Sequence, residues 1–467
     1  MKKTILITLL SITTISLFAK PSKADWKLVW SDEFNGKKLD TTKWSYQLGT
    51  GAQYGLESWG NNEQQYYTDQ NLYLKNGKLV IEARKEETNG KPYSSSRIRT
   101  VTEDGQELFT KKYGRFEARI KMPSGDGIWP AFWLLPATNK WGYWASSGEI
   151  DIMEAKGRLP NRTYGTIHFG SVWPGNMNTG DMYKFPENTD ITDYHVYALE
   201  WEPGILRWFV DDNLFYETSA WWGMNPDDDE PFPYPAPFDV PFYVILNLAV
   251  GGNFDENRIP DEEYDLPAQM FVDYVRVYEK KSGYNYDVKA PVPPRDTENF
   301  EKCRVTDNNF ISDSSFSTVN LTGMTDNQMD KNSGNWYLLA LNEFGGKASA
   351  TVEDSAIHVK SAVPGNEVHS VQLIQHLGIA KGYTYEISFD AKASAERKMA
   401  VKLGGDDDNK WAVYSRQYSP KLETEYKHFK YRFTMENDSD LQARLEFNMG
   451  IDSPDVWIKN IIVKTTN

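Results

Sequence analysis

The stretch Ser147-Gly-Glu-Ile-Asp-Ile-Met-Glu-Ala-Lys-Gly157 combines the pattern of a β-strand with three carboxylates, Glu149, Asp151 and Glu154. Successive side chains of a strand point to opposite faces, so Glu149 and Asp151 share one face and Glu154 would fall on the other. One extra residue, a β-bulge around Ile152–Met153, would return Glu154 to the side of the other two acids. Three like charges on one face repel each other and add no stability, so their collection favours a functional role.

A row of carboxylates of this kind suits glycoside hydrolysis with retention, in which one carboxylate attacks the anomeric carbon and a second, protonated one gives its proton to the leaving oxygen. Those two carboxyl groups must lie about 5–5.5 Å apart. Residues two apart on a strand are spaced by about 6.5–7 Å, so the bulge and the side-chain reach must close the gap between Glu149 and Glu154. Asp151 would hydrogen-bond one of them and keep their pKa values apart. The alternative for an isolated Glu-x-Asp-x-x-Glu pattern is a solvated strand face.

Further blocks flank this stretch. In chain order they are Val29-Trp-Ser-Asp-Glu-Phe-Asn-Gly36, Asn61-Asn-Glu-Gln-Gln-Tyr-Tyr-Thr68, Tyr113-Gly-Arg-Phe-Glu-Ala-Arg-Ile-Lys121, Gly127-Ile-Trp-Pro-Ala-Phe-Trp-Leu-Leu-Pro136, Tyr194-His-Val-Tyr-Ala-Leu-Glu-Trp201, Leu246-Asn-Leu-Ala-Val-Gly-Gly252 and Val272-Asp-Tyr-Val-Arg-Val-Tyr278. With the acidic stretch they resemble glycoside hydrolase family 16, in its laminarinase (endo-β-1,3-glucanase) branch. The resemblance implies a concanavalin A-like jelly roll whose concave sheet forms a sugar cleft. It also implies Glu149 as nucleophile, Glu154 as acid and base, and Asp151 as the residue that orients them.

Tryptophan is concentrated in the same part of the chain, where 13 of the 16 residues lie between Trp26 and Trp222. Aromatic rings stack on the apolar faces of pyranose rings, whereas core filling is the alternative role. The resemblance favours sugar contact for Trp129, Trp133, Trp144 and Trp201. It also places Asn62 in a substrate-binding loop and His168 in the cleft, although the sequence around His168 alone is equally compatible with a core histidine.

The length of 467 residues predicts two or three domains. Short alternating runs divided by Gly, Pro, Asn and Asp follow one another over residues 26–279, which predicts an all-β fold of two packed antiparallel sheets. The formal net charge of −15 disfavours nucleic acid and anionic membranes as partners. We therefore expect a neutral polysaccharide, a β-glucan, as the partner of a monomeric chain, with no cofactor for catalysis.

The first 24 residues have the pattern of a signal peptide. Lys2 and Lys3 precede an apolar run over residues 5–18, and Ser22-Lys-Ala24 supplies small residues for cleavage after Ala24. The alternative is an uncleaved anchor. Cys303 is the only cysteine, so neither a disulfide nor a lipid-modified start is expected. We expect a secreted, periplasmic or cell-surface protein whose mature form has no membrane segment.

After Tyr278 the pattern changes. Residues 280–304, with Pro291-Val-Pro-Pro294, predict a linker, and alternation resumes over residues 305–467 as a second β-sandwich. Gly382-Tyr-Thr-Tyr-Glu-Ile-Ser-Phe-Asp-Ala-Lys392 and Val456-Trp-Ile-Lys-Asn-Ile-Ile-Val463 resemble carbohydrate-binding modules of family 4. The candidate ligand contacts are Trp336, Gln372, Gln375, Trp411 and Tyr414. The alternative is a structural spacer domain.

The family resemblance implies a structural Ca²⁺ ion at the positions of Glu33, Gly77 and Asp273, partly through backbone oxygens, which suit calcium. It leaves the substrate partly open. Met153 separates this strand from the shorter Glu-Ile-Asp-Ile-Glu pattern of lichenases, which act on mixed-linked glucan, but agarases and carrageenases share the inserted residue. The acidic composition favours β-1,3-glucan over sulfated galactans. A lectin-like binder without hydrolytic activity is a further alternative, which the presence of all three acids disfavours.

Overall fold

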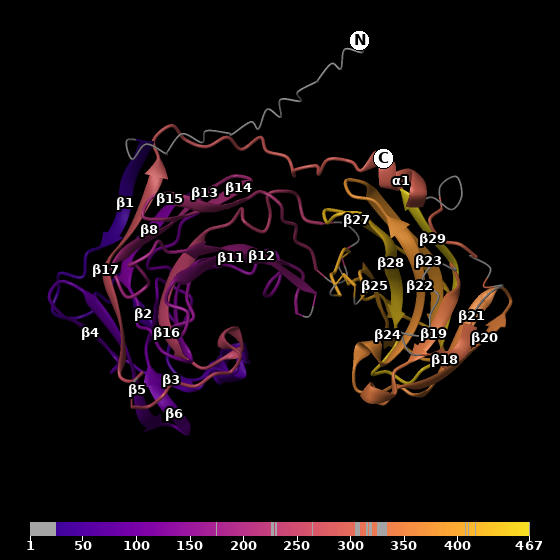
Figure 1. Ribbon diagram of the computed structural model, residues 1–467, viewed down its shortest axis with the longest axis horizontal. Helices are drawn as coiled ribbons and strands as arrows, with labels where there is room; N and C mark the ends of the chain where they lie inside the picture. Colours follow the sequence, from indigo (N-terminus) through magenta and orange to yellow (C-terminus); the bar gives the residue numbers. More distant parts are fainter. Residues whose placement is uncertain are drawn as a thin grey trace, which may run out of the picture.

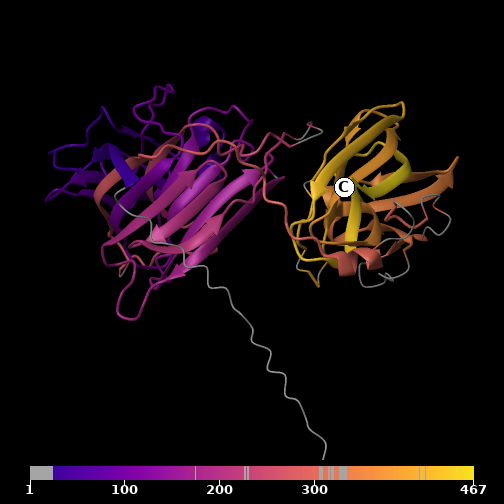
Figure 2. The same cartoon turned by 90° about the horizontal axis from the view of Figure 1, so that it is seen from above.

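The computed structural model folds the chain into two β-units, drawn in indigo through magenta to salmon and in orange to yellow in Figure 1. It describes residues 25–466, except residues 174, 226, 227, 229, 230, 264, 304–308, 314, 315, 317–319, 325–333, 407, 410 and 416. We call residues 25–280 the first unit and residues 296–466 the second unit. Seen from above, the two units are separate bodies joined by one chain crossing (Figure 2).

The first unit consists of strands and short 3-10 turns. Its elements are β1 (Trp26–Asp32), β2 (Ser45–Tyr46), η2 (Ala52–Tyr54), η3 (Glu57–Gly60), β3 (Gln65–Tyr67), β4 (Leu72–Leu74), β5 (Leu79–Thr88), β6 (Lys91–Ser95), β7 (Arg97–Arg99), β8 (Gly114–Lys121), β9 (Ile128–Pro136), β10 (Glu149–Glu154), β11 (Arg162–Gly170), β12 (Asn176–Lys184), β13 (His195–Glu202), β14 (Ile205–Val210), β15 (Asn213–Thr218), β16 (Phe242–Val250), η4 (Asn253–Asp255) and β17 (Ala268–Lys280).

These strands form two packed sheets, as the alternating sequence predicts. One sheet of ten strands has the order β15-β14-β13-β8-β17-β5-β6-β3, in which β1 also pairs with β17 and β4 also pairs with β5. The other sheet has the order β12-β11-β10-β9-β16-β7-β2. Large apolar side chains of both sheets, among them Phe132, Ile150, Trp208 and Leu246, are buried between them. The architecture is a β-sandwich jelly roll, and its pairings are antiparallel except for β3 with β6. The predicted fold class is confirmed.

The described residues of the second unit form one α-helix, two five-stranded sheets and a two-stranded sheet of β24 and β26. Its elements are α1 (Thr297–Cys303), β18 (Asn320–Met324), β19 (Trp336–Ala340), η6 (Asn342–Phe344), β20 (Lys347–Glu353), β21 (Ala356–Val363), η7 (Val368–Ser370), β22 (Val371–Ile379), β23 (Thr384–Ala393), β24 (Arg397–Lys398), β25 (Ala400–Gly404), β26 (Lys421–Leu422), β27 (Lys427–Thr434), β28 (Asp440–Asn448) and β29 (Val456–Thr465). The sheets have the orders β18-β19-β22-β28-β25 and β20-β21-β29-β23-β27, and a second core lies between them.

Part of the segment predicted as a linker, residues 280–304, belongs to the second unit. Its last residues form α1, where Phe300 stacks on Tyr383 with ring centroids 3.8 Å apart and Cys303 is buried in the second core. The proline content around Pro291 correctly indicated extended chain, but it did not reveal that a short amphipathic helix follows and packs against the sandwich.

The predicted signal peptide, residues 1–24, lies outside the described residues. Within the part of the chain that the structure describes, no helix is long and apolar enough to cross a membrane.

Candidate active site

The acidic strand β10 lies in the middle of the seven-stranded sheet, between β9 and β11. Its pairing with both neighbours shifts after Asp151, so that Ile152 and Met153 are both buried in the core. The predicted β-bulge is therefore confirmed, and it places Glu154 on the same side of the sheet as Glu149 and Asp151. We call the side chains of Glu149, Asp151 and Glu154 the acid row.

Two tryptophans hold the ends of the acid row. Trp144 Nε1 donates a hydrogen bond of 3.0 Å to Glu149 Oε2, and Trp129 Nε1 donates one of 2.9 Å to Glu154 Oε1. Each indole N–H favours the charged form of its carboxyl group and fixes the direction of one oxygen. The two glutamates are thus oriented independently, by donors that come from different loops and strands.

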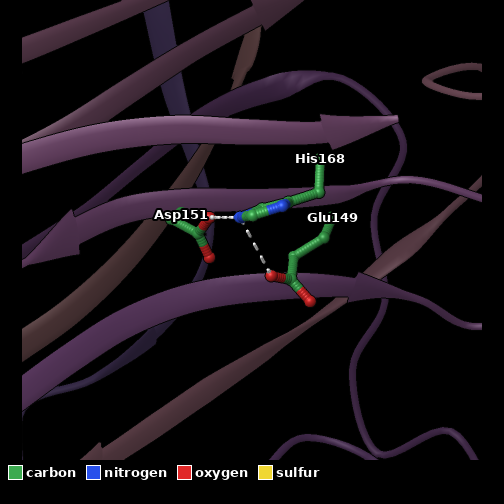
Figure 3. A group of neighbouring side chains, drawn as sticks. All are labelled: Glu149, Asp151 and His168. Carbon is green, nitrogen blue, oxygen red and sulfur yellow. Dashed lines mark ion pairs between the residues drawn. The ribbon is translucent and has the colours of Figure 1, made fainter. Parts of the chain in front are cut away.

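A histidine completes the centre of the row. His168 lies opposite Glu149 on β11, and its Nε2 is 3.4 Å from Asp151 Oδ2 and 3.7 Å from Glu149 Oε1 (Figure 3). Burial disfavours the imidazolium, but the hydrogen bond to Asp151 and the charges of Glu149 and Asp151 outweigh it and raise the pKa of His168 to about 9. A positive charge therefore sits beside Glu149 and Asp151 at neutral pH.

Burial and the like charge of Asp151 raise the pKa values of both Glu149 and Glu154. The positive charge of His168 and the indole donor of each glutamate act in the opposite direction, and the pKa of Glu154 is raised further than that of Glu149. Glu154 therefore keeps its proton more firmly than Glu149. A retaining glycosidase requires this difference between its acid and its nucleophile.

Among the described residues, Glu149, Asp151 and His168 are the one group of potential metal ligands with donor atoms within 4.8 Å of one another. In this structure His168 forms ion pairs with the two carboxylates, at 3.4 Å from Asp151 and 3.7 Å from Glu149.

The carboxylates expected to hold calcium are paired with basic side chains, and the ion itself, held partly through backbone oxygens, stays a prediction. Glu33 makes a two-pronged ion pair with Arg276, at 2.9 and 2.7 Å, and Asp273 pairs with Lys78 at 2.8 Å and Arg119 at 2.7 Å. Both carboxylates are therefore neutralised by basic side chains. Gly77 adopts a left-handed conformation in the turn before β5 and offers only backbone atoms.

Two predicted sugar-contacting tryptophans differ in their surroundings. Trp133 is half-buried on β9, pairs with Asp151 across the strands and donates a hydrogen bond of 2.7 Å to Asn247 Oδ1. Trp129 is nearly buried, and Phe254 stacks on its ring at 5.0 Å. Trp129 thus leaves little surface for a sugar, and its contact with Glu154 is its clearest link to the chemistry.

The prediction for Trp201 is wrong. Trp201 lies on β13 in the ten-stranded sheet, it is fully buried in the core between the sheets, and its Nε1 donates to the carbonyl of Phe238. Asn62 is exposed, as a binding residue requires, but its amide donates a hydrogen bond of 2.9 Å to Asn257. Its contact with a sugar stays a prediction.

A buried polar network near the acid row escaped the sequence interpretation. The carboxylate of Glu63 accepts hydrogen bonds from Gln65 and Tyr67, and Asn247 links Tyr67 to Trp133. Arg97 lies beside this network on β7. The available signal was Asn61-Asn-Glu-Gln-Gln-Tyr-Tyr-Thr68 itself, in which Glu63, Gln65 and Tyr67 are two residues apart and share the buried face.

Of the five candidate contacts in the second unit, two are in error. Trp336 is fully buried in the core and its Nε1 donates to the carbonyl of Asp313, while Gln375 is fully buried and bonds to Ser312 and Gly334. Both side chains hold the unit together and are out of reach of a ligand.

Gln372 and Trp411 lie on the opposite side of that sheet, whereas the ring of Tyr414 packs against the edge of the second core. Gln372 alternates with core residues of β22 and bonds to Asn448 and Glu446 of β28, in a row that also contains Arg444. Trp411 is about half exposed (49%), with its ring 5.0 Å from the guanidinium of Arg444, and Tyr414 donates a hydrogen bond of 2.8 Å to Asp440. An exposed indole over a row of polar side chains suits a sugar.

Comparison with known proteins adds independent findings. A family model described as Glycosyl hydrolases family 16 matches residues 57–259, and one described as Carbohydrate binding domain matches residues 308–456. The Glucan endo-1,3-beta-glucosidase A1 of Niallia circulans is 47% identical over 278 residues, which are 56% of this chain and 39% of that protein. The Beta-glucanase of Rhodothermus marinus is 44% identical over 261 residues, which are 54% of this chain and 85% of that protein. The catalytic domain of an endo-1,3-beta-glucanase (laminarinase) from Thermotoga petrophila has 38% identity and a TM-score of 0.48, covering 55% of this chain and 99% of that domain.

Proposed function

The chain belongs to glycosyl hydrolases family 16, and from this we propose that it is a secreted endo-glycosidase that hydrolyses β-1,3-glucan of the laminarin type with retention of configuration. The observation that carries the proposal is the bulge in β10, which gathers two glutamates of different proton affinity on one side of the sheet.

In this mechanism Glu149 is the ionised nucleophile. It attacks the anomeric carbon and forms a glycosyl-enzyme bond as the glycosidic bond breaks. The indole N–H of Trp144 and the imidazolium of His168 both favour the negative charge on Glu149 before attack. Asp151 holds His168 in place through the contact of 3.4 Å and does not itself react.

Glu154 is the acid and then the base. Burial and the charge of Asp151 keep its carboxyl group protonated until the leaving oxygen takes the proton. In the second step the same carboxylate removes a proton from the water that attacks the glycosyl-enzyme, which frees Glu149 and restores the starting state. The hydrogen bond from Trp129 fixes one oxygen of Glu154 in both steps.

The assignment to β-1,3-glucan is supported by the similarity to the Glucan endo-1,3-beta-glucosidase A1 of Niallia circulans. The aromatic side chains near the acid row, Trp133 and Trp144, suit neutral sugar rings. For the second unit we propose binding of the same polysaccharide, and for residues 1–24 export of the chain by signal peptide.

The test is product analysis on a panel of polysaccharides. The chain without residues 1–24 is incubated with laminarin, lichenan, agar and carrageenan, and reducing ends and product lengths are followed with time. We expect laminarin to give a ladder of oligosaccharides early in the reaction, with the β-anomer appearing first in proton NMR. Products from a galactan alone would overturn the assignment to β-1,3-glucan. Release of the α-anomer first would overturn the retaining mechanism. Binding to the polymers without any products would make the chain a lectin-like binder.

A further inference from the structure

A buried arginine lies between two tryptophans next to the acid row. The guanidinium carbon of Arg97 is 4.4 Å from the ring centroid of Trp59 and 4.8 Å from that of Trp133. Arg97 is only 6% exposed, and its Nε has no hydrogen-bond partner among the described residues. A cation this deeply buried needs a negative charge and a close-packed environment to be tolerated.

Glu63 is one of two largely buried carboxylates, with Glu149, on which the charge of Arg97 acts. Its carboxylate is 3% exposed and lies close enough to Arg97 for the positive charge to act on it, while burial raises the pKa of Glu63. Glu63 is tied down by the amide of Gln65 at 2.6 Å and the hydroxyl of Tyr67 at 3.1 Å. Glu63 is therefore held in one position by neighbours that are themselves buried.

From Glu63 a chain of hydrogen bonds leads to the floor of the site. Tyr67 bonds to Glu63, Asn247 Nδ2 donates to the hydroxyl of Tyr67 at 3.1 Å, and Trp133 Nε1 donates to Asn247 Oδ1 at 2.7 Å. Trp133 is thus fixed twice, at its edge by Asn247 and on its face by Arg97, and it is the strand neighbour of Asp151.

We propose that Arg97 and Glu63 are positioning residues that hold the Trp133 indole as a sugar-binding platform beside the acid row. The inference rests on the proposed function, because the platform has a role only if a glycan occupies the site. It is consistent with the direction in which Arg97 acts on the nucleophile: its charge lowers the pKa of Glu149. Neither side chain touches the reacting atoms, so the effect is on substrate position and on the charge state of Glu149.

The experiment compares Arg97→Gln, Arg97→Lys and Glu63→Gln with the wild-type chain and with Arg115→Gln as a matched control. Arg115 is an equally buried arginine on β8 of the other sheet, paired with Glu117 at 3.0 Å and Glu200 at 2.9 Å. For each variant kcat and KM on laminarin are measured across pH, together with the melting temperature. The dissociation constant for a β-1,3-linked glucose hexamer is measured in the Glu149→Gln background, where no turnover occurs.

We expect Arg97→Gln to raise KM and the dissociation constant about tenfold while kcat changes much less, since one aromatic contact with the sugar is misplaced. In Arg97→Gln the acid limb of kcat/KM should also move to higher pH. Arg97→Lys should restore the position of that limb but leave KM raised, because an ammonium keeps the charge and lacks the flat stacking surface. Glu63→Gln should raise KM in the same way. Arg115→Gln should lower the melting temperature and leave KM and the limb unchanged.

An Arg97→Gln chain that is folded and has wild-type KM and wild-type affinity overturns the positioning role and leaves the proposed function intact. The same holds if Arg97→Gln and Arg115→Gln differ from the wild type only in melting temperature. A wild-type chain that neither binds nor hydrolyses β-1,3-glucan overturns both proposals, because the platform then has no sugar to hold.

Discussion

Trp129 Nε1 lies 2.9 Å from Glu154 Oε1, and this hydrogen bond is the direct contact between a tryptophan of β9 and the proposed acid. A donor to the charged form of a carboxyl group lowers its pKa. Burial and the charge of Asp151 raise the pKa of Glu154, and the bond from Trp129 opposes them.

Replacement of Trp129 by Phe should raise the pKa of Glu154 and move the alkaline limb of kcat/KM to higher pH. A hydrogen bond to a charged group contributes about 1.5–3 kcal/mol, so the shift should reach about 1–2 pH units at most. The measurement is the pH profile on laminarin. Trp141→Phe is the control, because Trp141 donates its N–H to Asp239 and contacts no member of the acid row; an equal shift in both variants would contradict the prediction.

Replacement of Glu154 by Gln should lower kcat on laminarin by about 10²–10⁴-fold, the usual contribution of a general acid. With a synthetic aryl glycoside whose phenol leaves without protonation, the first step should be nearly normal. A burst of phenol followed by slow turnover, read by stopped-flow absorbance, would show that only the second step still lacks its base. Equal losses on both substrates would argue against the acid role of Glu154.

His168 should make stability depend on pH. Its pKa is about 9 in the folded chain, above the ordinary value of about 6.5. The folded state therefore keeps a proton that the unfolded state releases, so the stabilisation is complete below about pH 6.5 and disappears as the pH rises through 9. His168→Gln should unfold more easily than the wild type by about 1–3 kcal/mol at pH 6, with the difference closing near pH 9. Urea unfolding at several pH values tests this.

The control for that experiment is His428→Gln. His428 lies at the surface of the second unit, where it contacts Asp390 at 2.7 Å with a side chain 60% exposed. A surface ion pair contributes about 0–1 kcal/mol, so this variant should follow the wild type. A pH-independent loss in His168→Gln would mean that the imidazole acts by packing alone.

Trp201→Ala should destabilise the chain by about 3–5 kcal/mol, because it leaves a cavity among Tyr113, Phe116 and Phe242. The folded fraction should bind laminarin with unchanged KM. Trp144→Phe should show the reverse, with a normal melting temperature and altered kinetics, since its ring is exposed and contacts Glu149. A raised KM in Trp201→Ala at temperatures where it is folded would restore its predicted role in sugar binding.

In the second unit, Trp411→Ala should reduce retention on insoluble β-1,3-glucan at least about tenfold without changing turnover of short soluble oligosaccharides. Trp457→Ala is the matched control, because Trp457 stacks on His358 on the other sheet. Pull-down with the insoluble polymer measures both. Equal binding by wild type and Trp411→Ala would remove this face as the ligand site.

The sequence was sufficient to predict the bulge in β10, because the parity of strand side chains permits Glu154 to join Glu149 and Asp151 in no other regular way. The same alternation also indicated the position of Trp201. Its neighbours Glu200 and Glu202 are charged and face away from the core, so Trp201 between them faces the core. Family resemblance outweighed that signal, and the prediction failed. Gln375 likewise shares its strand face with Leu373 and Leu377, which are core residues.

Arg97 and Glu63 could not be identified in this way. Their significance arises from contacts of β7, β9 and β16 with β3 and the loop before it, whose residues are up to 185 positions apart in the sequence and meet only in the folded sheet. Periodicity reports which face a side chain occupies, but it does not report which distant residue shares that face.

The chain between the two units has little slack. Tyr284 and Tyr286 pack on Tyr113 of the first unit, and Asp296 is hydrogen-bonded to Lys381 of the second, which leaves mainly Lys289–Pro294 without such anchors. Six residues of extended chain reach roughly 20 Å, and the prolines stiffen them. When the second unit is bound to a polymer, the first unit is confined to a small volume around that binding position. Its effective concentration there is of the order of millimolar. With this short connection, the first unit would cleave an insoluble glucan several times near one binding position before the second unit dissociates.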